Sequence, residues 1–156
     1  MSVETKQKPS AIAVSQLQEL IQINIDSRDG FRQAAQAIDD LTLQSAFELL
    51  ADNRQDQSDE LARFVPWSGK LPRRAGSYSA AMYQSWMSIR EMLSSDDRYA
   101  ILCEAERGED SIKAAYEDVL RCTAGCVVHD VLVSHYDAIN SAHDRIRDLR
   151  DECKCG

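Results

Sequence analysis

The sequence has few residues that bend or break helices, since 156 residues include only three prolines and six glycines. All three prolines lie at or before Pro72. Sandwiches and barrels built from many short strands need more turn residues than this. The chain also lacks an apolar run near the ~20 residues that span a bilayer, and its first ten residues contain no apolar signal core. These shortages favour long helices and exclude a membrane protein, and we expect a cytoplasmic location.

Positive charge is scarce as well. Eighteen Lys and Arg residues stand against 26 Asp and Glu residues, which gives a net charge of -8. A surface of that sign repels phosphate backbones, so we expect no nucleic-acid partner. The five cysteines are an odd number, and a chain of this length can bury its own core, so a secreted disulfide framework is disfavoured.

The apolar spacing predicts one helical domain over residues 11–152, between a flexible tail at 1–10 and a short Cys-containing tail at 153–156. Four predicted helices are long, about 24 to 27 residues, and one is shorter, near 18 residues. The breaks between them are expected at Asp39-Asp40, at the loop 66–76 followed by a Ser77 cap, at a capping box from Ser94 to Asp97, and at the turn 122–125. The last helix is expected to end near Glu152.

Helices of this number and length suit a four-helix bundle. The short helix lies between the second and third long helices, where it can carry the chain back along the bundle. Those two long helices would then run parallel, as in bundles with one long crossover connection.

Each predicted long helix carries polar residues in the middle of its apolar stripe. Antiparallel packing would bring them to one level, and buried polar groups must be paired, so we expect a connected polar layer. The predicted network comprises Arg28, Arg54, Gln57, Asn140 and Tyr116.

Three stretches are similar to a known family: DSRDGF at 26–31, CEAERGED at 103–110 and HDRIRDLRD at 143–151. Together with the order of the helices, they resemble a bacterial ferritin-like family of four-helix-bundle proteins of unassigned function, within the ferritin-like superfamily. The resemblance covers most of residues 12–152 and implies a fold more than an activity.

Di-iron ferritin-like proteins use a Glu on two helices and Glu-x-x-His on the other two. By the resemblance, Glu109 and His143 match ligand positions, and Glu106 and Asp26 are nearby metal candidates. Asn140 replaces the Glu partner of His143, and Arg54-x-x-Gln57 and Arg28 replace other ligands. About two of the six ligands remain. The two arginines could pair with Glu109, Glu106 or Asp26, or could extend from the edge of the stripe to water.

Two functions follow from this pattern. The first is a metal-free, non-enzymatic structural or interaction protein, stress-associated by the resemblance, without catalytic residues or a cofactor. The alternative is a protein that binds iron, manganese or zinc and has oxidoreductase or storage activity. We also expect a homo-oligomer, a dimer by the resemblance, in which the face of Met82, Trp86 and Ile89 either pairs two copies or simply covers the bundle.

The cysteines form two further candidate groups. Cys122, Cys126 and His129 are close in sequence but lack the C-x2-C spacing of a structural zinc site. Cys153 and Cys155 could form a thiol pair near Cys103, or could belong to a frayed end of the chain.

Overall fold

A computed structural model describes residues 11–66, 78–93 and 97–155. Five helices lie within this described part: α1 Ala11–Ala37, α2 Leu41–Leu61, α3 Tyr78–Met92, α4 Arg98–Cys122 and α5 His129–Cys155. The predicted all-α class is therefore confirmed. The expected tail at 1–10 and the expected Ser77 and Ser94 caps lie outside the described residues.

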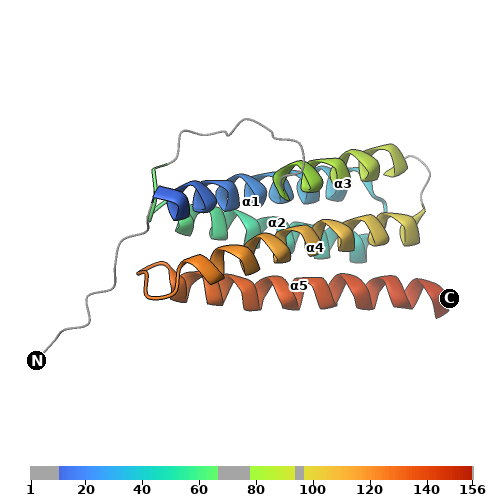
Figure 1. The fold of residues 1–156 in the computed structure, drawn as a ribbon. Helices are drawn as coiled ribbons and strands as arrows, with labels where there is room; N and C mark the ends of the chain where they lie inside the picture. Colours follow the sequence, from blue (N-terminus) through green and yellow to red (C-terminus); the bar gives the residue numbers. More distant parts are fainter. Residues whose placement is uncertain (1–10, 67–77, 94–96, 156) are drawn as a thin grey trace, which may run out of the picture.

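The helices form two antiparallel hairpins, and α3 runs along one side of them, next to α1 (Figure 1). α1 and α2 make the first hairpin, and α4 and α5 make the second. α2 and α4 run in the same direction, because α3 returns the chain toward the end where α4 begins. α3 packs on α1 and α4. None of the described helices combines the length and the apolar composition needed to cross a bilayer.

The start of α4 differs from its prediction. The Asp97 carboxylate accepts a hydrogen bond from the backbone N–H of Ala100 at 3.0 Å, so Asp97 is the N-cap and the helix begins at Arg98. The capping-box spacing from Ser94 to Asp97 instead predicts Asp97 inside the first turn. Asp is itself one of the best N-cap residues, and the sequence offers both choices three residues apart.

The helix α5 also ends later than expected. It continues to Cys155, three residues beyond Glu152. Cys153 therefore belongs to the helix, where it packs against the apolar core.

The core consists of two apolar clusters, one toward each end of the bundle. One cluster includes Phe31, Phe47, Leu102 and Ile146. The other is built around residues such as Leu20, Ile112 and Leu132. The boundary between the clusters falls at the middle of each long helix, which is where the polar side chains lie.

The short helix α3 reaches the bundle because both helices beneath it carry a glycine. Trp86 lies directly against Gly30 of α1, and its ring meets Phe31 edge-on at a centroid distance of 4.8 Å. Met82 lies over Gly108 of α4. Met82 and Ile89 are each only 1% exposed. The face of Met82, Trp86 and Ile89 thus covers the bundle, and it is not free to pair two copies.

Candidate functional site

A buried ion pair lies at the centre of the bundle. Arg54 of α2 and Glu109 of α4 are 0% and 1% exposed, and Nη2 of the arginine contacts Oε2 of the glutamate. Both positions face inward because they continue the apolar stripes of their helices at three- and four-residue spacing. The pair joins the two hairpins.

The remaining nitrogens of Arg54 also have partners. Nε donates to Oγ of Ser27 at 3.2 Å, and Nη1 donates to Oε1 of Gln57 at 3.3 Å. The guanidinium thus connects α1, α2 and α4 in one layer. A buried charge is strongly unfavourable unless it is paired and hydrogen-bonded, and Arg54 meets both conditions. Glu109 meets them less fully, because its Oε1 is buried without a hydrogen-bond partner.

A second set of polar contacts runs from the core to solvent. Nδ2 of Asn24 donates to the hydroxyl of Tyr116 at 2.9 Å, and that hydroxyl lies 3.0 Å from Nδ1 of His135. Nε2 of His135 lies 3.0 Å from Oε1 of Glu60, whose side chain is 46% exposed. Four residues from four helices therefore form a continuous chain of hydrogen bonds.

The direction of this chain follows from Asn24. Its amide nitrogen also donates to the backbone carbonyl of Leu20 at 2.9 Å, and a carbonyl can only accept, so the amide orientation is fixed. The Tyr116 oxygen accepts from Asn24, which directs the phenolic hydrogen to Nδ1 of His135. The histidine is then the neutral Nε2–H tautomer, and it donates to the Glu60 carboxylate.

Burial sets the protonation states along the chain. It raises the pKa of Tyr116 far above its usual range, so the hydroxyl stays protonated. Burial also lowers the pKa of His135, and the positive charge of Arg54 acts in the same direction, whereas the Glu60 carboxylate opposes them. His135 is therefore neutral at pH 7.

This histidine predicts a pH dependence of stability. Because the pKa of His135 is lower in the folded chain, the unfolded chain binds its proton first, at a pKa of about 6.5. We expect the free energy of unfolding to fall as the pH drops below about 6.5 and to level off below the folded-state pKa. Urea unfolding of the wild type and of His135→Gln between about pH 8 and about pH 5 measures this. Equal pH slopes for the two proteins would contradict the prediction, since His129 and His143 are present in both.

His135 was missed in the sequence analysis, although a signal for it exists. It lies three residues after Leu132 and four before Ile139, which are both fully buried. That spacing places it on the apolar stripe of α5. Asn140 and His143, the residues of α5 that the resemblance favours, are only partly buried.

Two members of the predicted polar network lie elsewhere. Arg28 is at the edge of α1, where it binds Oε1 of Gln55 at 2.6 Å and Oδ1 of Asp29 at 2.7 Å. These contacts do not include the expected pairing with Glu109, Glu106 or Asp26. Neighbouring residues of a helix point about 100° apart, and Ser27 points into the bundle, so the side chain of Arg28 points to its edge. Asn140 lies beside Tyr136. The structure places the other members, Arg54, Gln57 and Tyr116, in the interior.

The four candidate metal ligands do not converge. Glu109 binds Arg54, whereas Glu106 binds Arg150 at the seam between α4 and α5. Nε2 of His143 lies at the same seam, 2.9 Å from Oδ1 of Asp110 and 3.6 Å from Oε1 of Glu106. Asp26 accepts a hydrogen bond from Gln22 at 3.0 Å. Within the described part of the chain, no three His, Cys, Asp or Glu side chains form a group that could hold a metal ion.

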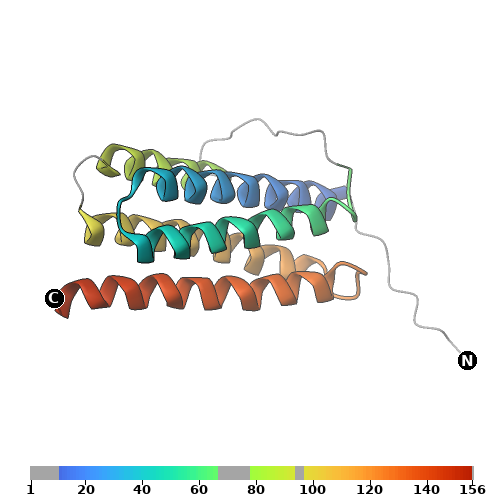
Figure 2. The ribbon, with the colours of Figure 1, turned by 180° about the vertical axis from the view of Figure 1, so that it is seen from behind.

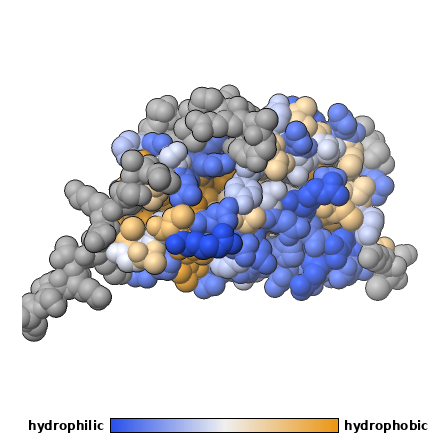
Figure 3. All heavy atoms as spheres, viewed as in Figure 1, coloured by the Kyte–Doolittle hydropathy of each residue, from blue (hydrophilic) through white to orange (hydrophobic). Residues whose placement is uncertain are grey.

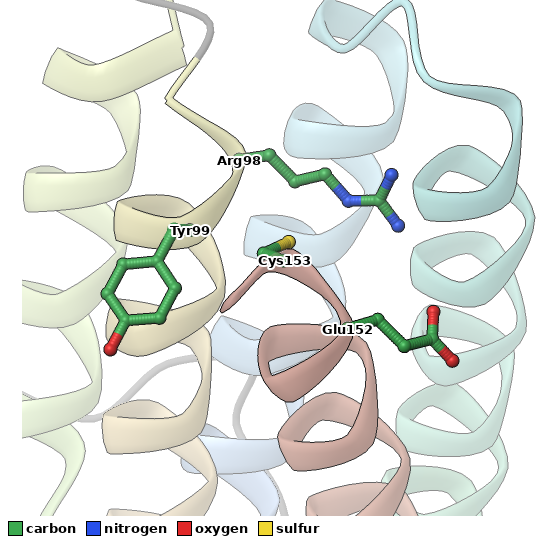
Figure 4. A pocket seen from close by; sticks show the side chains of 4 residues that line it. All are labelled: Arg98, Tyr99, Glu152 and Cys153. Carbon is green, nitrogen blue, oxygen red and sulfur yellow. The ribbon is translucent and has the colours of Figure 1, made fainter. Parts of the chain in front are cut away.

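The cysteines with described side chains, Cys103, Cys122, Cys126 and Cys153, are free thiols. Cys153 lines a pocket of about 550 Å³ at one end of the bundle, with Arg98, Tyr99 and Glu152 (Figure 4). Its Sγ donates to the carbonyl of Leu149 at 3.4 Å, and Arg98 is held by Asp40 at 2.6 Å. The side chain of Cys155 lies outside the described residues, as does the predicted thiol pair. At the other end, His129 lies 3.3 Å from Oγ1 of Thr123.

Comparison with known proteins yields one match. No curated protein and no solved structure matches the chain. A family model described as "Domain of unknown function (DUF2383)" matches residues 12–122, which include α2 to α4, all but the first residue of α1, and both members of the buried ion pair. Because the match covers well over half of the 156 residues, the chain belongs to this family.

Proposed function

We propose that this protein is a ferritin-like four-helix bundle whose metal site is replaced by a salt-bridged layer, and that it acts in the cytoplasm as a non-enzymatic structural or interaction protein. The observation that carries the proposal is the full burial of Arg54 on Glu109 at mid-bundle. The parallel course of α2 and α4, with α3 in the crossover, supports the ferritin-like arrangement. A stress-associated role rests on the family resemblance alone.

The residues at the centre do not fit a pair of metal ions. The inward positions are Ser27 on α1, Arg54 and Gln57 on α2, and Glu109 on α4. On α5 the two apolar clusters meet between Ile139 and Ala142. At the level of the ion pair this helix therefore presents apolar side chains and no metal ligand to the centre. A di-metal site needs several carboxylates to balance ~4 positive charges. One carboxylate beside a guanidinium cannot provide that balance.

The alternative function is binding of iron, manganese or zinc with oxidoreductase or storage activity. The observation in its favour is the seam where His143 faces Asp110 and Glu106. The other oxygen of Glu106, Oε2, binds the Arg150 guanidinium, so this cation already balances the carboxylate charge that a metal ion would need. This competition makes the seam the weaker candidate.

Elemental analysis of the purified protein tests the two functions. We expect iron, manganese and zinc well below one ion per chain after both aerobic and anaerobic purification. Stoichiometric metal in the wild type would contradict the proposed function. The variants Asp110→Asn and Glu109→Gln would then locate the ion, since each removes one carboxylate ligand, the first only at the seam and the second only at the centre.

A further inference from the structure

The helices α2 and α5 leave a groove open between them. Figure 2 shows the two helices side by side and running in opposite directions. The groove has a volume of about 390 Å³. Ala46, Leu49 and Asn53 line it from α2, and Ala138, Ala142 and Arg145 line it from α5. α3 does not cover this pair, because it packs on α1 and α4.

The two walls of the groove have complementary shapes. Leu49 is 62% exposed, and together with Leu41 and Ser45 it continues a stripe along the outer side of α2 at four-residue spacing. The facing wall on α5 carries small side chains at Ala138, Ser141 and Ala142. A projecting leucine and a row of small residues are the knob and the hole of helix packing, and both lie on one face of the same chain.

One wall of the groove carries a charge without a partner. Arg145 of α5 makes no ion pair or hydrogen bond with any other described residue. Its acidic neighbours on α5, Asp144 and Asp148, are both bound to Arg147. An unpaired cation thus lines the α5 wall of the groove and is open to a polar or acidic group of a partner.

We propose that a second copy of this chain occupies the groove, with a two-fold axis that runs along it. A rotation of 180° about such an axis keeps each residue at its level along the bundle and exchanges the two walls. α2 of each copy then packs on α5 of the other. Leu49 enters between Ala138 and Ala142 of the partner copy.

The size of this face is in the range of specific dimers. The 21 residues of α2 span about 31 Å, and two neighbouring helices are about 20 Å wide. A face of these dimensions approaches the roughly 800 Å² per partner that such dimers bury. The inference depends on the interaction role in the proposed function and names its partner and surface.

Sedimentation velocity over a range of concentrations tests the surface. We expect a wild-type dimer, and we expect Leu49→Glu to raise its dissociation constant by at least about tenfold, because each dimer loses two buried leucines and gains two buried charges. The control is Val133→Glu, which places the same charge on an exposed residue of α5 outside the groove. It should leave the dissociation constant unchanged. A wild-type chain that is monomeric at every concentration would overturn the proposal.

A size exchange tests the orientation. Ala138→Leu should raise the dissociation constant several-fold, because it fills the space that receives Leu49 of the partner copy, and the double variant Leu49→Ala/Ala138→Leu should return it toward the wild-type value. A double variant no better than the singles would overturn the two-fold arrangement. Metal content separates this inference from the proposed function: a metal-free monomer contradicts only the dimer surface, and a metal-loaded dimer contradicts only the metal-free centre.

Discussion

Replacement of Arg54 with methionine is expected to lower the free energy of unfolding by about 3–5 kcal/mol. Methionine fills a similar volume, but it leaves the Glu109 carboxylate buried without its partner. Oε1 of Glu109 already lacks a hydrogen-bond partner, and Oε2 accepts its hydrogen bond from Arg54. The variant would therefore remove the hydrogen bond of Oε2 as well. Chemical denaturation monitored by circular dichroism measures the change.

The double variant Arg54→Met/Glu109→Leu separates the buried charge from the packing. Replacement of both partners of a buried ion pair by apolar residues is often neutral or stabilising, so most of the lost stability should return. A strongly favourable coupling energy in the double-mutant cycle is the expected result. Arg28→Met is the matched control on a half-buried arginine, and it should cost less than about 1 kcal/mol. An Arg54→Met variant as stable as that control would contradict the role of the buried pair.

Gly30→Ala should destabilise the bundle by roughly 1–3 kcal/mol. A Cβ atom at this position would overlap the ring of Trp86, which is partly buried and packs against the apolar cluster that contains Phe31. Either α3 must move away or Trp86 must leave its rotamer and its contact with Phe31. Thermal and urea unfolding report the loss, and the near-ultraviolet circular dichroism of the tryptophan should change with it.

The matched control is Gly108→Ala on the other helix beneath α3. There the Cβ would lie 3.3 Å from Sδ of Met82, a flexible side chain that can yield. The helix gains up to ~1 kcal/mol when alanine replaces glycine, so we expect Gly108→Ala to be neutral or slightly stabilising. Equal effects of the two substitutions would show that the contact with Trp86 does not limit the packing of α3.

The sequence predicts the helices well because their apolar stripes are long and regular. The 3.6-residue period alone is enough to predict the break at Asp39-Asp40 and the apolar positions from Leu17 to Leu149. The polar layer was harder to predict, since one residue turns a helix by ~100° and polar side chains on both edges of a stripe fit the period about equally. Asn140 and His143 were preferred over His135 for that reason. Which charged residues of two helices meet also depends on how far one helix is shifted along the other. The hydrophobic period of a single helix carries no information about that shift.

The position of the Arg54–Glu109 pair has a consequence for folding. Each hairpin joins neighbouring helices through a short turn, so each can form from contacts that are local in sequence. The two members of the pair are 55 residues apart and belong to different hairpins, so they meet only when the hairpins dock. A docked arrangement displaced by one turn, about 5.4 Å, would bury Arg54 beside the apolar side chains of either cluster. The pair thus penalises misaligned docking, and we expect it to act at the step in which the two hairpins meet.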